Sequence, residues 1–414
     1  MEKKEKLLIL GCSVGTEDAL QYAKELGVYT IITDNITPGE NSLKRLADEY
    51  WMIDVADVDV LESKCKEEMV SGIFAATSEF CLDKAKELCE RLKLPFYASD
   101  EGWATARDKE RFKRHCVDCG INVPKKYDVY GPISEELLKE ISWPVIVKPA
   151  DSYAQIGLSV CHNAEELRKG YEFALQKSRM GKVVVEEYIE GDEISALYLI
   201  KDGQIRNIDV INFFYMPING RNNFTYTVQN SIFSEEYEKK CSDKIERLLK
   251  VLGCWNGTIF FQAIRKNGVY YFLEMNYRLN GAASWFSDEK RTGINILKYM
   301  VDLALQRETK QWLSKGKISI YQAGGNYFIW ARPGKVERVE GVKKVEEIEG
   351  VRVILQNFHA GDFVPEEVSM KQIAFNICLV AEDKEKIKRK IQDINETLHL
   401  YDSEENEMLL YFRE

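Results

Sequence analysis

The sequence predicts a mixed fold, in which an α/β domain with a parallel sheet precedes α+β domains, and two observations carry that prediction. In residues 1 to about 97, short apolar strands such as KLLIL and YTIIT alternate with helical segments. Strands that alternate with helices form parallel sheets with crossover helices. Further along, Phe260 to Gly281 reads as two strands around Asn267-Gly268, a dipeptide typical of tight hairpin turns.

The composition is typical of a soluble globular protein. The 414 residues are 45% hydrophobic and 30% charged, which leaves room for two or three domains. A net charge of -10 disfavours binding to nucleic acid or to an anionic membrane. No apolar run reaches the roughly 20 residues of a membrane span, and Leu7 to Leu10 is too short for a signal peptide. We therefore expect a cytoplasmic protein with no nucleic-acid or membrane partner.

Cysteine and histidine give no metal or redox motif of the usual kinds. The ten cysteines are scattered, which suits free thiols in a reducing compartment. Cys116 and Cys119 form the single C-x-x-C, and no second pair follows at zinc spacing. The four histidines form no H-x-x-x-H group, so zinc chemistry is disfavoured.

The N-terminal region leaves a dinucleotide-binding alternative open. We expect a helix from Thr16 to Leu26 that ends at Gly27, helices near 57–70 and 79–92, and further strands at WMIDV, GIFAAT and LPFYAS. The loop Gly11 to Gly15 lacks the full G-x-G-x-x-G pattern, although Asp34 follows the second strand as a ribose-binding acid would. The incomplete glycine pattern disfavours an NAD-dependent dehydrogenase.

The hairpin carries polar side chains that could meet at one cation. Gln262 lies on the first strand, while Glu274 and Asn276 share a face of the second because they are two residues apart. A few oxygen ligands, shared with phosphates, suit Mg²⁺. Arg278 follows and could hold a phosphate. The alternative is a half-exposed strand with unrelated polar residues.

Three other stretches place charges next to apolar strands or at a helix start. A charged helix begins at Asp108-Lys109 and ends at Gly120. Lys148 ends the apolar strand WPVIVKP, where a lysine either extends to solvent or meets an anion. The strand VVV runs into Glu186 and then Glu193, which could equally form a charged turn.

The remaining segments are less specific. We expect an irregular run over residues 216–233, around Arg221, that serves as an acceptor-recognition loop or as a surface crossover. Helices follow at Ser234 to Leu252, near 290–306, and from Asp383 to Leu398, and strands lie between residues 318 and 381. Asn280 to Ser284 is a candidate site for an anionic substrate.

The segment Glu274-Met-Asn276-Tyr-Arg278 resembles the E-x-N-x-R motif of ATP-grasp ligases, and the other stretches fit that superfamily in order and spacing. The resemblance implies a preATP-grasp, Rossmann-like domain over residues 1–98. It further implies a two-lobed ATP-grasp domain over 99–310, with a lid at about 127–192, and a small C-terminal α+β domain over 311–414.

The resemblance also implies a role for each motif residue. Lys109 and Lys148 contact the ATP phosphates. Arg278, with Lys148, stabilises the transferring phosphoryl group. The adenine site is lined by Glu186, Tyr188 and Ile189, and Glu193 binds the ribose. The ligands of Mg²⁺ or Mn²⁺ are Gln262, Glu274 and Asn276.

The implied activity is ATP-dependent ligation of a carboxylate to an amine through an acyl phosphate, with small-molecule substrates and a C-terminal domain that closes the site or forms a homodimer surface. Gln262, where most members have an acid, resembles the carbamoyl-phosphate synthetase branch. An enzyme of that kind or of purine synthesis is therefore an alternative. The lid loop holds Tyr153, Ala154 and Gln155 where glycine or serine is usual, so a non-catalytic nucleotide-binding protein is another.

Overall fold

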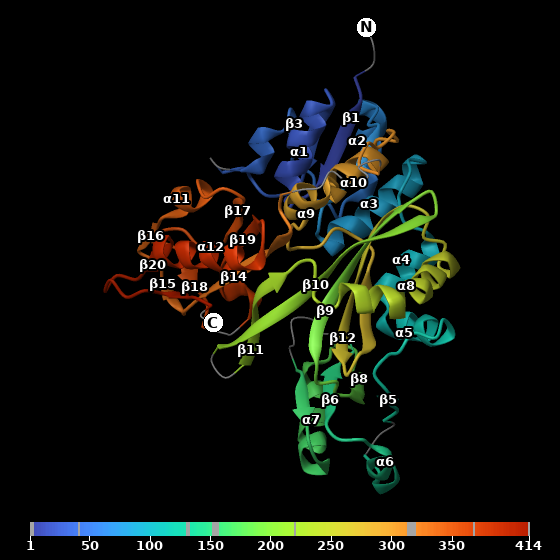
Figure 1. Cartoon of the computed structure of the whole chain (residues 1–414). Coiled ribbons are helices and arrows are strands. Elements are labelled where there is room, and N and C mark those ends of the chain that lie inside the picture. The colour runs from blue at the N-terminus through green and yellow to red at the C-terminus, as the bar shows by residue number, and fades with distance from the viewer. Residues whose placement is uncertain are drawn as a thin grey trace.

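The structure is a computed structural model that describes residues 4–39, 42–129, 133–150, 157–218, 221–312, 320–366 and 369–412. The N-terminal sheet, a small lobe with β6 and β8, and a long sheet that runs into the C-terminal region are separate in Figure 1. The predicted mixed architecture is confirmed. Tyr153, Ala154 and Gln155 of the lid loop lie outside the described residues.

The N-terminal sheet is parallel, as predicted, with strand order β3-β2-β1-β4. Its strands are β1 (Lys6–Leu10), β2 (Tyr29–Thr33), β3 (Glu49–Trp51) and β4 (Gly72–Phe74), and its helices are α1 (Thr16–Glu25), α2 (Val58–Glu68) and α3 (Glu79–Leu92). Apolar residues fill both faces of β1, where residues 7–10 are buried, because helices cover a parallel sheet on both sides.

Three details of this region differ from expectation. The WMIDV strand begins earlier and keeps only Trp51 of that segment, and LPFYAS forms no strand. Gly15, with φ of 94°, is the residue before α1, so Thr16 does not cap the helix; its Oγ1 accepts a hydrogen bond from the Ser13 N–H at 3.0 Å instead.

The small lobe is a four-stranded antiparallel sheet in the order β5-β8-β6-β7. It comprises β5 (Lys126–Tyr127), α6 (Glu135–Glu140), β6 (Val145–Pro149), β7 (Ser159–Cys161), α7 (Ala164–Lys177) and β8 (Val183–Glu187). Its core is separate from the other cores and includes Val145, Val147, Leu167 and Val185. This lobe spans Lys126 to Glu187, close to the range of about 127–192 predicted for the lid, and its role as a lid stays a prediction.

The long sheet has the order β13-β12-β9-β10-β11-β14-β19-β17, with β21 beside β14. Its strands are β9 (Asp192–Lys201), β10 (Gln204–Ile218), β11 (Arg221–Val228), β12 (Gly257–Lys266), β13 (Val269–Asn276), β14 (Ala323–Ala331), β17 (Val351–Gln356), β19 (Ile373–Ala381) and β21 (Leu409–Leu410). Two short pairs complete the C-terminal region: β15 (Gly334–Lys335) with β18 (Phe363–Val364), and β16 (Arg338–Glu340) with β20 (His399–Tyr401).

The prediction of an irregular run over 216–233 is wrong. β11 occupies 221–228 and pairs with β10 as an antiparallel arm that is prominent in Figure 1. Its Phe224, Tyr226 and Val228 suit a pleated surface, and their packing outweighs the turn preference of the asparagines.

Helices cover both faces of the long sheet. They are α4 (Asp100–Arg107), α5 (Lys109–Asp118), α8 (Ser234–Val251), α9 (Trp285–Thr292), α10 (Ile296–Ala304), α11 (Val342–Glu346) and α12 (Lys384–Thr397). The single helix expected near 290–306 is two helices, because Gly293 adopts φ of 76° and ends α9. No helix in the described ranges is long and apolar enough to cross a membrane.

Candidate functional site

The β12–β13 hairpin places Gln262 directly opposite Glu274, and Phe260 opposite Asn276. Asn267 and Gly268 form its two-residue turn with φ of 51° and 75°. From that turn, uninterrupted pairing would put Glu274 opposite Phe261, on the wrong face. The register shifts by one residue after Ala263–Phe272, so Leu273 is a β-bulge. The bulge brings Glu274 and Asn276 to the Gln262 face of the sheet.

Lys109, Glu274, Asn276 and Arg278 line one cavity of about 350 Å³. The Lys109 Nζ lies 2.7 Å from the Glu274 Oε2, and the Asn276 Nδ2 donates to the Glu274 Oε1 at 3.3 Å. Burial would raise the pKa of Glu274, but Lys109, Asn276 and Arg278 outweigh it, so this pKa is lowered and the group is ionised at neutral pH.

Arg278 is held by the N-terminal region. Its Nη2 lies 3.1 Å from the Oε1 of Glu79, the first residue of α3, and its Nη1 donates to the Leu279 carbonyl at 2.9 Å. Arg107 meets the other oxygen of Glu79 at 3.1 Å. Sequence reasoning missed Glu79 and Arg107. Their signal was position: Glu79 follows β4, and ligand sites in parallel sheets lie beyond the carboxyl ends of strands.

Glu193 lies near the hairpin acid, at the start of β9. Burial raises its pKa, the negative charge of Glu274 raises it further, and a hydrogen bond from the Tyr215 hydroxyl acts in the opposite direction. The predicted ribose acid and the predicted metal ligand are therefore close enough to interact. Tyr215, on β10, was not predicted.

In the lid, Lys148 and Glu186 come together with a third residue, Lys113 of α5. The Lys148 Nζ lies 3.0 Å from the Glu186 Oε2, and Lys113 pairs with the Glu186 Oε1. Burial would raise the pKa of Glu186, but the two lysines outweigh it and lower this pKa. Both carboxylate oxygens are engaged, so an adenine amino group would have to displace a lysine. The proposed adenine role of Glu186 stays a prediction.

Tyr188 and Ile189 follow β8 at the edge of the lid sheet. The Tyr188 N–H donates to the Pro144 carbonyl at 3.1 Å, and the Ile189 side chain is buried. Their backbone therefore lies beside the Lys148 strand. Lys148 and Glu186 do not line the hairpin cavity. Instead, α5 connects the two groups, because Lys109 and Lys113 are one helical turn apart.

The hairpin residues fit a divalent cation shared with phosphates. Asn276 has an amide oxygen and Glu274 a carboxylate at the cavity, while Gln262 pairs with Glu274 but does not line the cavity. These ligands are too few for an all-protein site but suit Mg²⁺ that keeps phosphate and water ligands. Thr105 also lines the cavity, but its hydroxyl oxygen is buried and has no hydrogen-bond partner among the described residues.

The Asn280–Ser284 segment is arranged differently from expectation. The Ser284 hydroxyl donates to the Asp288 Oδ2 at 2.8 Å, and Asn280 donates to Ser284 at 2.7 Å. Burial and the nearby Asp209 raise the pKa of Asp288 to about 7, although Arg291 opposes that shift. The Ser284 hydroxyl is thus engaged with a carboxylate, and a role of this segment in binding an anionic substrate stays a prediction.

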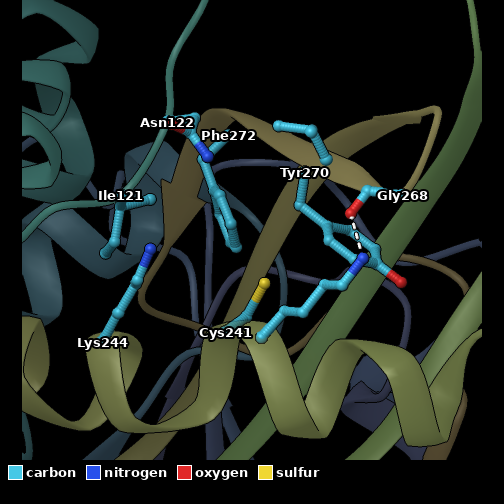
Figure 2. A pocket seen from close by; sticks show the side chains of 9 residues that line it. Ile121, Asn122, Cys241, Lys244, Gly268, Tyr270 and Phe272 are labelled. Atoms are coloured by element: carbon cyan, nitrogen blue, oxygen red, sulfur yellow. Dashed lines mark hydrogen bonds between the residues drawn. The ribbon is translucent and has the colours of Figure 1, made fainter.

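A second depression, of about 290 Å³, lies behind the hairpin, on the side of Tyr270 and Phe272 (Figure 2). Lys240 of α8 donates to the Gly268 carbonyl at 2.7 Å there and holds the hairpin turn against the helix. The lining includes none of the predicted site residues, so this depression is separate from the candidate site.

Comparisons with known proteins agree with this geometry. Residues 108–311 match the family model of the carbamoyl-phosphate synthase L chain, ATP binding domain. The carbamoyl phosphate synthase large chain of Thermoanaerobacter pseudethanolicus is 28% identical over 305 residues, which are 70% of this chain and 28% of that protein. The chain therefore spans less than a third of that relative.

Two solved structures share the fold over nearly the whole chain. The L-amino acid ligase of Bacillus licheniformis superposes with a TM-score of 0.78 at 17% identity, covering 100% of both chains. The biotin carboxylase domain dimer of Hydrogenobacter thermophilus 2-oxoglutarate carboxylase, in complex with MgADP, ADP and bicarbonate, gives a TM-score of 0.77 at 19% identity, covering 99% and 92%. Residues 108–311 are therefore similar to the ATP-binding domain of carbamoyl-phosphate synthases, and the whole chain shares the fold of these two structures.

Proposed function

We propose that the protein is an ATP-dependent ligase that joins a carboxylate to an amine and releases ADP and phosphate. The observation that carries the proposal is the cavity in which Lys109, Arg278, Glu274 and Asn276 converge. Cations and cation ligands in one concave site are what a triphosphate requires. We also propose the division into residues 1–98, 99–310 and 311–414.

The nucleotide would contact both halves of the ATP-grasp region. Lys109 and Lys148 would donate to its phosphates, Glu193 would accept from the ribose hydroxyls, and Tyr188 and Ile189, with Glu186, would line the adenine. Gln262, Glu274 and Asn276 would hold Mg²⁺ or Mn²⁺, which neutralises phosphate charge when bound. The MgADP in the structure of the Hydrogenobacter thermophilus domain supports this choice of cofactor.

The reaction follows from those positions. A substrate carboxylate oxygen attacks the γ-phosphorus, the bond to the bridging oxygen breaks, and ADP leaves. Arg278, anchored by Glu79, is placed to stabilise the charge on the transferring group. An amine nitrogen then attacks the acyl carbon, loses a proton, and expels phosphate. The chain supplies position and charge and no covalent nucleophile.

A second candidate function is supported by Gln262. An amide at the metal position where most members have an acid resembles the carbamoyl-phosphate synthetase branch, and the matched family model is of that kind. A carboxylate kinase of that type would use the same cavity but would phosphorylate a small acid such as bicarbonate. The full-length match in fold to a stand-alone L-amino acid ligase favours the first candidate.

Two further features belong to the proposal. The dimer named for the Hydrogenobacter thermophilus domain supports a homodimer here. All ten cysteines are unpaired, and nine of them are buried, which supports a location in the reducing cytoplasm.

The test is ADP release with Mg²⁺ over a panel of carboxylates, each with and without amines. Glu274→Gln should lower turnover by about 10²–10³-fold while the unfolding transition is unchanged, because a charged ligand near the phosphates is lost. Glu246→Gln, on the exposed side of α8, is the matched control. Wild-type turnover by Glu274→Gln at low magnesium would contradict the metal role. ATP-dependent stabilisation without ADP release on any substrate would indicate a nucleotide sensor.

A further inference from the structure

The largest cavity described here, of about 600 Å³, lies away from the hairpin acids. It lies where the β10–β11 arm, the entry to α8 and the helix α12 come together, around the start of β9. Its volume is within the range of small-molecule sites, roughly 300–1,000 Å³. Neither the hairpin metal ligands nor the lid lysines line it, but Glu193, the acid assigned to the ribose, does, so the cavity adjoins the proposed nucleotide site.

One wall of this cavity is a row of aromatic rings. Phe214 of β10 stacks on Tyr226 of β11 with ring centroids 5.8 Å apart, and Tyr226 lies 6.2 Å from Phe412. Phe214 is 43% exposed and Ile232, at the rim, is 77% exposed. Large apolar groups left open to solvent beside a cavity mark a binding surface more often than a packing surface.

The row of rings is fixed in place before any ligand arrives. The Tyr327 hydroxyl donates to the Asn395 Oδ1 at 2.7 Å, and the Phe412 N–H donates to the Tyr327 oxygen at 2.9 Å. Asn395 also donates to the Phe412 carbonyl at 3.2 Å. The terminal segment is thereby attached to α12, and a preformed cavity binds at lower entropic cost.

Helix α12 gives the cavity polar and cationic lining residues, and Asp192 and Glu193 at the start of β9 also line it. Lys384, Lys388, Gln392 and Asn395 of α12 line the cavity, and their spacing of about four residues places them along one side of the helix. A cavity lined by aromatic rings and by two lysines is complementary to a ligand with an aromatic body and an anionic end.

We propose that this cavity is a second ligand site, and that it binds a small aromatic carboxylate with its ring on Phe214, Tyr226 and Phe412 and its carboxylate toward Lys384 and Lys388. The site is separate from the cavity assigned to the phosphates.

The second site shares a hydrogen bond with the nucleotide site. Tyr215 and Glu193, the acid assigned to the ribose, both line the cavity, and the Tyr215 hydroxyl donates to Glu193. A ligand that moves Tyr215 changes the partner of Glu193, so the two sites affect each other's affinity by the same factor. This coupling, unlike the site itself, rests on the proposed function.

The test is calorimetric titration of the full chain with indole-3-acetate, without nucleotide, and with neutral indole as the comparison probe. Wild type should bind one equivalent of indole-3-acetate and bind indole more weakly. The double variant Lys384→Met/Lys388→Met should lose roughly tenfold or more in affinity, because two cationic donors are removed. Lys386→Met, on the same helix but not in the lining, is the matched control and should bind as wild type does.

Gln392→Trp, an exposed helix position on the cavity wall, should block the site without affecting folding. The proposal would be overturned if Gln392→Trp bound indole-3-acetate as tightly as wild type does. It would also be overturned if wild type bound indole as tightly as indole-3-acetate, or showed no saturable binding of indole-3-acetate. A change of oligomeric state in Gln392→Trp would also overturn it, since the cavity would then be a contact between two copies.

The coupling has its own readout. ATP should change the affinity of wild type for indole-3-acetate and should leave that of Tyr215→Phe unchanged. If the protein binds no nucleotide at all, the proposed function fails while the titrations without nucleotide still decide the second site. If ATP binds and shifts both proteins equally, the Tyr215 connection is wrong.

Discussion

Helix α5 supplies a lysine to each of two acids, and the two pairs differ in burial. Lys109 meets Glu274 of the hairpin at 2.7 Å, with side chains 59% and 24% exposed. One turn later, Lys113 meets Glu186 of the lid, with side chains 11% and 2% exposed, and Lys148 occupies the other oxygen of Glu186.

The difference indicates which charges a ligand can exchange. An exposed pair contributes little to stability, so Lys109 can leave Glu274 for a phosphate and free that acid for a cation. A buried pair is expensive to open, because each charge left without a partner loses its compensation. Lys113 therefore holds Glu186 in place, while the half-exposed Lys148 can turn toward the nucleotide.

The largest effect we expect comes from removing Lys113, the buried lysine of α5. Lys113→Met should lower the free energy of unfolding by about 3 kcal/mol, because Glu186 then keeps only one cationic partner. Lys109→Met should lower it by less than about 1 kcal/mol. Denaturant unfolding of both variants measures the contrast, and equal losses would contradict the distinction between the two pairs.

The next largest effect concerns Lys148, which is itself partly exposed but pairs with the buried Glu186. Lys148→Ala should abolish the stabilisation that ATP gives to wild type, which at a ligand concentration of 100 Kd is about 2.7 kcal/mol. The thermal shift on adding MgATP measures it, relative to each protein without nucleotide. Unchanged ATP affinity in Lys148→Ala would count against the assignment of this lysine to the phosphates.

The smallest effect is on pH dependence. Lys113 and Lys148 hold the pKa of Glu186 below its ordinary 4.5, against the opposing effect of burial. The ionised group therefore stabilises the fold above that value, and this contribution is lost as the pH falls below it. As the pH falls below about 5, the free energy of unfolding should decrease more steeply in wild type than in Glu186→Gln. The difference in slope corresponds to the uptake of at most about one extra proton on unfolding. Parallel curves from acid titration of unfolding would show that the lysines do not perturb Glu186.

Much of the fold could be predicted from the sequence. Apolar strands alternating with helices predicted the parallel sheet, and Asn267-Gly268 predicted the hairpin turn, because these signals are local. The prediction of an irregular run at 216–233 was wrong because pairing with the preceding β10 and with β14 decides the state of β11, and β14 is remote in sequence.

The candidate site was predictable as a set of residues but not as a geometry. Simple alternation from the turn places Glu274 and Gln262 on opposite faces, and only the bulge at Leu273 reconciles them. No residue type at Leu273 signals a bulge. Lys113 was part of a recognised helix start, yet its role depends on contact with Glu186, 73 residues away.

The shared sheet has a consequence for how the protein can be dissected. β11 hydrogen-bonds to β14, so strands from before and after residue 311 belong to one continuous layer. A fragment that stops at the end of α10 would present the β11 backbone as an open edge, and open edges recruit strands from other molecules. Self-association of such a fragment would then report the missing neighbour and say nothing about the quaternary structure of the whole chain.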